Sequence, residues 1–441
     1  MPLFQPDAWR PFVMALRSTI PPGVREAEFR GTLARGSFGG SIAYDGDTRR
    51  AGLDLDRGDR PMDALRPLSA LVDGAPVAVR AVADESGAAT VSIVAASPQL
   101  TFGMGHDILE TVLLVAGADP EPYRRVPVRH DGAAVSPGAD PAAVTALVGR
   151  LLPAAQPADP SALAAAESGL GARLPDDVRA LYLAAGSGEL IMQPTDEDLF
   201  YGFQIMPLDD AAARSYLEPP QRYLSWAYGA TEAVAPDPHE RVQALATSPA
   251  WFVIGDDWGG NLYVVDLAPG PQGTVGQVLF VDHETTMGAS WVAPSLTELL
   301  TRRPAGMSGP GPQGALVVRV GPRSGKTVAD VRPETEVLFT GSALEPVDLS
   351  PLAGHGRLRT LVGGAGTIAD LAAITGLPAL EYLQLDIAGW QELIRAGQVP
   401  PNLLAAGLIG RADWAATVEV VNDLLAAWDL PAIEVTEIRP M

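Results

Sequence analysis

The chain has 441 residues, enough for about three domains of ordinary size, and its 47% hydrophobic residues exclude a disordered protein. Its 53 acidic and 31 basic residues give a net charge of −22, which disfavours nucleic acid and anionic membranes and favours a basic partner, although acidity also simply keeps a protein soluble. The absence of cysteine excludes disulfides, thiolate metal sites and a cysteine nucleophile, and fits a reducing cytoplasm.

The amino-terminal residues show no basic segment followed by an apolar core, so no signal peptide is expected. No run approaches the roughly 20 apolar residues that cross a bilayer, and we expect a cytoplasmic protein. Lys326 is the single lysine beside thirty arginines. Together with the abundant Ala, Gly and Pro, this ratio indicates bacterial coding at high GC content.

Residues 1–131 are predicted to form an α/β module of unassigned role. Apolar residues at helical spacing from Trp9 to Leu16 predict a first helix. Strands are then predicted at 29–33, 41–44, 77–82 and 89–95, and a short helix at 107–115. His106 and Glu110 would share a face of that short helix, but a pair without a third ligand is typical of an ordinary surface. The order of elements would suit a small binding module.

Residues 132–160 are predicted to be a linker rich in Pro, Ala and Gly, with a short helix at 142–152. The next domain is predicted at 161–302. Its first expected elements are helices at 161–169 and 174–185 and strands at 190–192 and 203–206, with an acidic loop, Asp196, Glu197 and Asp198, between the strands.

The most informative stretch is 251–284. Apolar runs at 251–254 and 262–265 predict an antiparallel hairpin, and 278–281 resumes the strand pattern after a turn of Gly and Pro. Two features are unusual for a plain hairpin. Trp258 lies in a glycine-rich loop where a large ring has little core to enter, and acidic residues stand at the strand ends: Asp256, Asp257, Asp282 and Glu284.

Short sequence pieces in and around this hairpin occur in the order found in a known family. They are Leu174-Pro175-Asp176-Asp177, Leu181-Tyr182, Met206-Pro207-Leu208, Gly255-Asp256, Gly259-Gly260, Asp266, Gly276-Gln277-Val278, Asp282-His283, Pro294-Ser295-Leu296 and Leu299-Leu300. Through them, residues 160–302 resemble the SUKH superfamily, the Smi/Knr type of immunity and cell-wall-regulator protein. The resemblance implies an α+β domain with an antiparallel sheet that binds another protein.

Residues 303–315 are predicted to be a second linker, after which Gly321–Thr327 reads GPRSGKT. A phosphate-binding loop has four residues between its first glycine and Gly-Lys-Thr, and here there are three. It also leads directly into a helix, whereas a proline and a strand pattern follow here. We therefore expect no nucleotide site.

Residues 316–441 contain an internal repeat. Asp348, Leu349, Leu352, Leu358 and Leu361 recur 22 residues later as Asp370, Leu371, Ile374, Leu380 and Leu383. This period resembles that of leucine-rich repeats, in which each unit supplies one strand to a stack. Strands at 336–340 and 403–408 would extend the stack, and a helix at 414–428 with a final strand at 432–438 would cap it.

The sequence thus predicts a multi-domain α+β protein without an evident catalytic site. The five histidines are scattered, and there is no H-E-x-x-H motif, nucleophile elbow or dinucleotide-binding turn. Asp256 and Asp257 supply too few oxygens for a hard cation, and a histidine such as His283 more often ends a strand than serves as a base. We expect no catalytic residue, metal or cofactor.

Three functions remain open, and protein binding is the first of them. The resemblance implies a bacterial immunity protein that binds and neutralises a toxin domain, often a nuclease, without enzymatic activity. The second is a regulatory scaffold for cell-wall or signalling proteins with no toxin partner, and the third is an enzyme acting through the N-terminal module. The expected partner is a basic protein, and its binding residues would be Asp256, Asp257, Trp258, Asn261, Tyr263, Asp282 and Glu284, with Asp196, Glu197 and Asp198 nearby.

Overall fold

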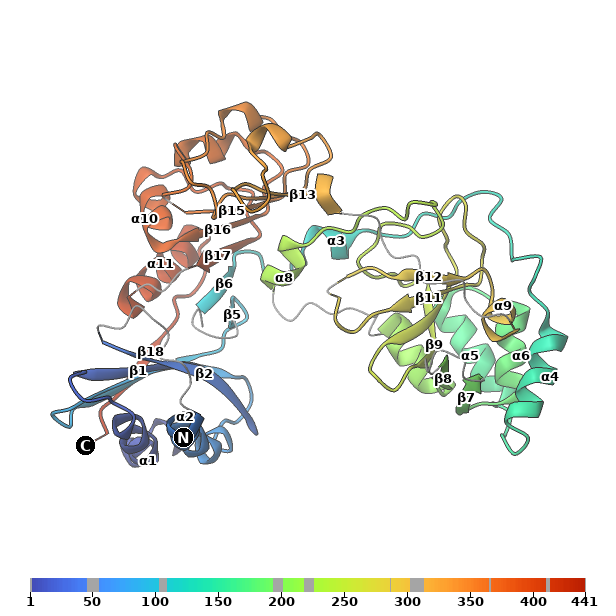
Figure 1. Cartoon of the computed structure of the whole chain (residues 1–441), viewed down its shortest axis with the longest axis horizontal. Coiled ribbons are helices and arrows are strands. Elements are labelled where there is room, and N and C mark those ends of the chain that lie inside the picture. Colours follow the sequence, from blue (N-terminus) through green and yellow to red (C-terminus); the bar gives the residue numbers. More distant parts are fainter. Residues whose placement is uncertain are drawn as a thin grey trace. The chain divides into compact units, whose positions relative to one another are not determined.

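The computed structural model describes residues 2–45, 55–102, 109–192, 201–217, 226–285, 287–301, 313–364, 366–409 and 413–440. The chain divides into two compact units, which we call the terminal unit (1–118, 225–227 and 318–441) and the central unit (119–224 and 228–317). Figure 1 traces the elements of both units. Over the described residues, none of the helices combines the length and the apolar character that a membrane crossing requires.

The first sheet of the terminal unit has the described strand order β18-β4-β3-β1-β2, and every neighbouring pair is antiparallel. Its elements are α1 (Pro6–Ser18), β1 (Glu26–Ala34), β2 (Ser37–Tyr44), α2 (Leu55–Ser69), β3 (Val77–Asp84), β4 (Ala89–Ala95) and β18 (Val435–Ile438). Helices α1 and α2 cover one face of the sheet (Figure 1). The ring of Phe12 in α1 packs there against Trp9 and against Phe29 of β1. The predicted first helix and the four predicted strands are confirmed.

The second sheet of the terminal unit combines strands from both ends of the chain. Its described order is β13-β14-β15-β16-β17-β6-β5. Its elements are β5 (Leu100–Phe102), β6 (Leu109–Leu113), β13 (Val317–Arg319), β14 (Val337–Phe339), β15 (Thr360–Val362), β16 (Tyr382–Asp386), α10 (Ile387–Ala396), β17 (Ala405–Ile409) and α11 (Trp414–Ala427). Strands at 336–340 and 403–408, the helix at 414–428 and the final strand are found close to their predicted bounds, whereas α10 is not expected from the sequence pattern.

The helix predicted at 107–115 is wrong over the part that is described. Residues Leu109–Leu113 form β6, which pairs antiparallel with β5 and with β17. Leu109 and Val112 are buried in the same core as the parallel strands, so tertiary pairing decides between two conformations that the apolar pattern allows. Glu110 therefore lies on a strand, and His106 lies outside the described residues.

The strands β14, β15, β16 and β17 are parallel and in register. Leu338, Leu361, Leu383 and Ala406 are paired along successive strands at intervals of 23, 22 and 23 residues, and all four are buried. The aspartates of the 22-residue repeat form equivalent hydrogen bonds in successive repeats. Asp348 accepts a hydrogen bond from the amide of Ser350, and Asp370 accepts one from the amide of Ala372, two residues ahead in each case. Asp370 is thereby the N-cap of its 3-10 turn, whereas Asp348 precedes the N-cap residue Leu349 of the other turn.

The central unit is built on one antiparallel sheet with the described order β12-β11-β10-β9-β8-β7. Its elements are α3 (Glu121–Arg124), α4 (Pro141–Leu151), α5 (Pro160–Leu170), α6 (Asp176–Ala184), β7 (Gly188–Met192), β8 (Tyr201–Ile205), α7 (Leu208–Ala212), β9 (Trp251–Asp256), β10 (Leu262–Asp266), β11 (Gln277–Val281), β12 (Ser290–Ala293) and α9 (Leu296–Thr301). The predicted hairpin is β9–β10, and it is extended by β11. Strand β12 is not expected from the sequence.

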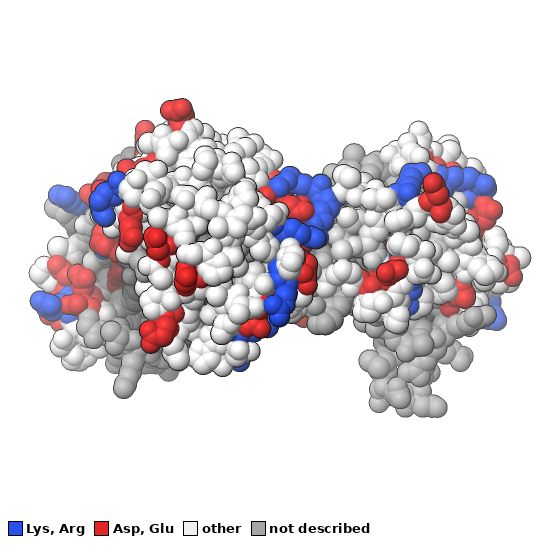
Figure 2. All heavy atoms as spheres, turned by 90° about the horizontal axis from the view of Figure 1, so that it is seen from above, with Lys and Arg blue, Asp and Glu red and all other residues white. Residues whose placement is uncertain are grey.

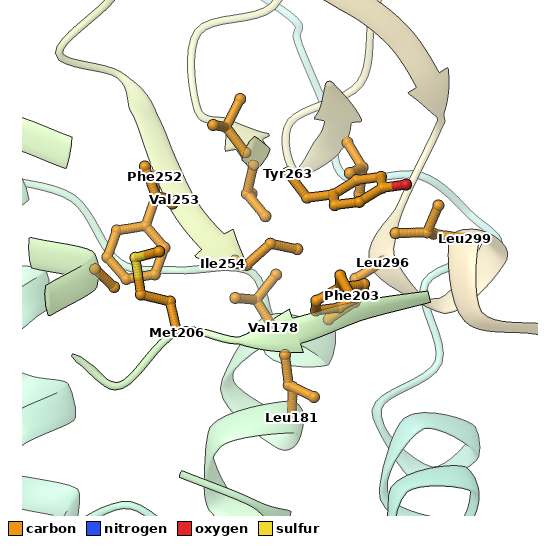
Figure 3. Close-up of a cluster of buried hydrophobic side chains, with 14 of the residues drawn as sticks. Val178, Leu181, Phe203, Met206, Phe252, Val253, Ile254, Tyr263, Leu296 and Leu299 are labelled. Atoms are coloured by element: carbon orange, nitrogen blue, oxygen red, sulfur yellow. The ribbon is translucent and has the colours of Figure 1, made fainter. Parts of the chain in front are cut away.

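The core of the central unit lies between this sheet and its helices. Figure 3 shows Val178 and Leu181 of α6 near Phe203 of β8 and Ile254 of β9. Leu296 and Leu299 of α9 belong to the same core (Figure 3). Tyr182 adds a hydrogen bond, because its hydroxyl donates to the carbonyl of Met206 at 3.1 Å.

Residues that carry the family resemblance contact one another. The carboxylate of Asp177 accepts hydrogen bonds from the amide and the hydroxyl of Thr297, both at 3.0 Å, and so ties the start of α6 to the start of α9. Gly276 has φ +89°, and a Cβ there would lie 2.6 Å from the ring of Pro175, so only glycine permits this approach. These contacts hold the start of α6 against α9 and against the turn before β11.

Candidate partner-binding surface

The loop between β9 and β10 is held by the side chain of Asp257. One carboxylate oxygen accepts hydrogen bonds from the amides of Gly259 (2.9 Å) and Asn261 (3.1 Å), and the other accepts one from the Asn261 side-chain amide (2.7 Å). Asp256 accepts a further hydrogen bond from the amide of Trp258 at 2.9 Å. Aspartates that accept from amides two residues ahead are typical turn formers, and here two of them in succession fix the loop.

Asn261 joins this loop to the turn that follows β11. Its side-chain oxygen accepts a hydrogen bond from the backbone amide of His283 at 2.7 Å, and the same oxygen lies 2.8 Å from Nδ1 of that ring. Because the carboxylate of Asp257 only accepts and the His283 amide only donates, the orientation of the Asn261 side chain is fixed. The contact to the ring therefore requires the proton on Nδ1 of His283.

We call the loop 256–261 and the turn 282–285 together the acidic head. Asp282 and Glu284 lie in the turn, where Asp282 accepts a hydrogen bond from the amide of Glu284 at 2.7 Å. The hairpin register pairs Leu262 with both Asp256 and Val281, so all four carboxylates converge at one end of strand β10. The side chains of Asp256, Asp257 and Asp282 are half-buried and Glu284 is exposed, which leaves their charges open to a partner.

Trp258 occupies a conformation that is rare for its residue type. Its φ is +64°, in the left-handed region that favours glycine, and the residue is 39% exposed. For a bulky side chain this conformation is an outlier that costs about 1–3 kcal/mol and is typical of functional loops. The hydrogen bond from its amide to Asp256 helps to hold it there.

Tyr263 is placed differently from the other predicted binding residues. It is 8% exposed, and its ring packs against Phe203 (5.3 Å between centroids) and Phe280 (5.4 Å). Burial, together with the nearby Asp257 carboxylate, raises the pKa of Tyr263 to about 12. The ring of Tyr263 is therefore part of the core next to the acidic head and is not part of the exposed surface.

Asp266 stands at the far end of β10 and is 1% exposed. Its carboxylate accepts hydrogen bonds from the Gln277 side chain (2.9 Å) and from the amide of Ala268 (3.0 Å). Burial outweighs these hydrogen bonds and raises the pKa of Asp266 to about 6. Asp266 and Gln277 are paired residues of β10 and β11. The buried side chain of this motif aspartate therefore links the two strands at the end of their pairing.

The remaining predicted site residues, Asp196, Glu197 and Asp198, lie outside the described residues. Among the residues that are described, no group of three or more His, Asp and Glu side chains is arranged to hold a metal ion. The link between Asn261 and His283 was not predicted. It follows from the hairpin register, since Leu262 pairs with Val281 and so brings Asn261 opposite the residues after β11.

The central unit is therefore an α+β domain that presents a hydrogen-bonded acidic loop at one end of an antiparallel hairpin. Residues 157–302 match the family described as SMI1 / KNR4 family (SUKH-1), which confirms the resemblance inferred from the sequence. A relative named "Glucan synthesis regulatory protein", from Neurospora crassa, is 35% identical over 85 residues. That alignment covers 18% of this chain and 16% of the relative.

The matched family concerns residues 157–302 alone. It includes immunity proteins and regulators of cell-wall glucan synthesis, which act through contacts with other proteins, and it is not known as a family of enzymes. The match ends at residue 302, so it says nothing of the parallel strands or of the amino-terminal sheet.

Proposed function

We propose that residues 161–302 form a non-enzymatic protein-binding domain whose acidic head contacts a basic protein. The observation that carries this proposal is the set of carboxylates on a backbone fixed by Asp257 and Asn261. A loop that is ordered before binding loses little conformational entropy when the partner arrives. Its charges steer a basic partner toward the surface and give an association that weakens with salt.

Trp258 supplies the apolar part of the proposed contact. A partly exposed tryptophan beside carboxylates combines a large apolar area with hydrogen-bonding neighbours, as is common where one protein anchors on another. The strain of its left-handed backbone is then explained by the position that it gives the ring. Asp256, Asp257, Asn261, Asp282 and Glu284 would surround it.

The proposed partner is a toxin domain, in keeping with the immunity proteins of the family, and a nuclease would offer the basic surface required. The alternative partner is a protein of cell-wall regulation or signalling, and the name of the Neurospora crassa relative favours it. Both proposals use the same acidic head. They differ in the identity of the captured protein.

For the terminal unit we propose a leucine-rich-repeat-like stack. The parallel register of β14 to β17 supports this assignment, and so do Asp348 and Asp370, each of which accepts a hydrogen bond from the amide two residues ahead. We propose domain limits of 1–131, 161–302 and 316–441, with the exchange of strands β6 and β18 joining the first region to the third. The stack would then be a scaffold carried on the same chain as the binding domain.

Affinity capture from extracts of the source cells tests the proposal. Wild-type protein is compared with the double variant Asp256→Asn/Glu284→Gln, which removes two charges and keeps the acceptor oxygen that holds Trp258. We expect the variant to lose the partner at physiological salt. Mass spectrometry of the captured protein decides between a toxin domain and a regulator.

The matched control is Asp209→Asn/Asp210→Asn, which removes two exposed charges from α7 in the same unit. It should capture the partner like the wild type. If both double variants lost the partner equally, the loss would follow from the change in net charge alone. That result would contradict specific binding by the acidic head.

A further inference from the structure

A pocket of about 340 Å³ lies in the central unit, at the end of β10 opposite the acidic head. Its floor contains residues 267–269, which directly follow Asp266. Its basic lining consists of Arg129, His130 and Arg173. Three basic side chains around one cavity stand out in a chain with a net charge of −22.

On the face that Figure 2 shows, basic side chains lie in groups, each with acidic side chains beside it. In the pocket, Arg173 forms an ion pair with Asp176 at 2.6 Å, and both side chains are largely exposed. Arg129, His130 and the neighbouring Asp131 make no side-chain hydrogen bond or ion pair within the described parts of the chain. Arg129 therefore keeps its full hydrogen-bonding capacity for a ligand.

The segment that carries Arg129 and His130 is fixed on both sides. Before it, the Gln243 side chain accepts from the amide of Val128 (2.9 Å) and donates to its carbonyl (2.7 Å). After it, the amide of Val275 donates to the carbonyl of Ala134 at 2.9 Å, next to a bridge between Val135 and Val275. The same Gln243 amide group also donates to the carbonyl of Ala268 in the pocket floor. One wall and the floor are thus held together before any ligand binds.

We propose that this pocket binds a small ligand through an oxyanion, either a phosphate or a carboxylate. Its volume lies in the range of small-molecule sites. Guanidinium groups present several N–H donors in a plane and are the side chains best suited to oxygen anions, and the imidazole adds another donor. The site is separate from the acidic head, because the five residues of β10 lie between them.

Titration of the full-length protein with inorganic phosphate and, separately, with acetate tests the proposal. Binding is followed by the NMR signal of the His130 imidazole at constant pH and ionic strength, assigned through His130→Gln. We expect a saturable shift with at least one anion, and the anion that binds more tightly identifies the chemistry. Arg129→Gln should weaken binding at least about 5-fold because it removes a charge-assisted hydrogen bond.

The control is Arg150→Gln, which removes an exposed arginine from the last turn of α4, outside the pocket. It should bind the anion as the wild type does, and so should Asp256→Asn/Glu284→Gln in the acidic head. No saturable shift with either anion, or equal weakening in Arg129→Gln and Arg150→Gln, would overturn the proposal without affecting the function proposed for the acidic head.

Discussion

Asp176 and Asp177 are adjacent aspartates with different surroundings. Asp177 is 1% exposed and accepts hydrogen bonds from Thr297 and from the amide of Val178. Asp176 is exposed and pairs only with the exposed Arg173 among the described residues. Buried carboxylates with satisfied hydrogen bonds contribute far more to stability than surface ion pairs. Substitutions at Asp177 and at Asp176 should therefore have very different effects on the free energy of unfolding.

We expect Asp177→Ala to lower the free energy of unfolding of the central unit by about 2–3 kcal/mol. The substitution leaves the buried amide of Thr297 without its acceptor, and the Thr297 hydroxyl keeps only its longer hydrogen bond to the carbonyl of Asp140 at 3.3 Å. Asp176→Ala should change it by less than about 0.5 kcal/mol. Hydrogen exchange of the α9 amides in the full-length protein measures both. Similar protection in the two variants would show that Asp177 is not the tie between α6 and α9.

Asp266 makes the stability of the central unit depend on pH. Its pKa is raised to about 6 by burial, so between pH 4 and pH 6 the folded state binds more protons than the unfolded state. Stability therefore falls as pH rises through this window, by up to about 3 kcal/mol for a shift of about two pKa units.

Comparison of the wild type with Asp266→Asn by urea unfolding at pH 4 and at pH 7 tests this expectation. The variant cannot ionise, so its stability relative to the wild type should increase as the pH rises. Only the change of this difference with pH is diagnostic, since the substitution also alters the hydrogen bond to Gln277. A difference that does not vary with pH would exclude a raised pKa for Asp266.

At the scale of elements, the first and last parts of the chain share their sheets. Strand β18 pairs with β4, and β6 pairs with β17. Ile438 of β18 belongs to the same core as Trp9 and Phe29. The amino-terminal sheet is therefore completed by residues near the end of the chain.

We expect Ile438→Ala to destabilise the amino-terminal sheet by about 2 kcal/mol, the low end for a buried isoleucine, because β18 is short. Faster hydrogen exchange in β3 and β4 would report this loss. Glu437→Ala, at an exposed position of the same strand, should leave exchange unchanged. If exchange in β3 and β4 were the same in both variants, β18 would contribute no stability to that sheet.

Elements with a clear local pattern were predictable from the sequence, and elements with a short or ambiguous pattern were not. The β9–β10 hairpin is signalled by two apolar runs, and the helix α1 by a clear period, so each needs no information from elsewhere. Strand β6 was mistaken for a helix because its short apolar run fits either conformation, and its pairing with β5 and β17 is not visible in that run. A short apolar run is ambiguous until such a partner is known.

In the acidic head, too, only part of the arrangement could be predicted from the sequence. Its carboxylates could be identified from their positions at strand ends, but the roles of Asp257 and Asn261 as the groups that fix the loop depend on geometry. Tyr263 was predicted with them because it is close in sequence, but β10 is buried from Tyr263 to Asp266 and the ring packs against Phe203 and Phe280. The basic pocket was missed because Arg129 and Arg173 come from segments that only the fold brings together.

At the scale of the whole molecule, the net negative charge influences the rate at which the protein associates with a partner. A net charge of −22 attracts basic proteins in general, and the screening length of about 8 Å at physiological salt limits this attraction to short range. Specific recognition then depends on carboxylates that are held in place, as in the acidic head. The two contributions differ in their response to salt and to local substitution.

The most direct test is the association rate of the captured partner, measured at about 50 mM and about 500 mM salt. We predict that the wild type and Asp209→Asn/Asp210→Asn associate at similar rates that fall steeply with salt, and that Asp256→Asn/Glu284→Gln associates at least about 10-fold more slowly at low salt with a weaker salt dependence. Equal rates for the two double variants at both salt concentrations would contradict the acidic head as the binding surface.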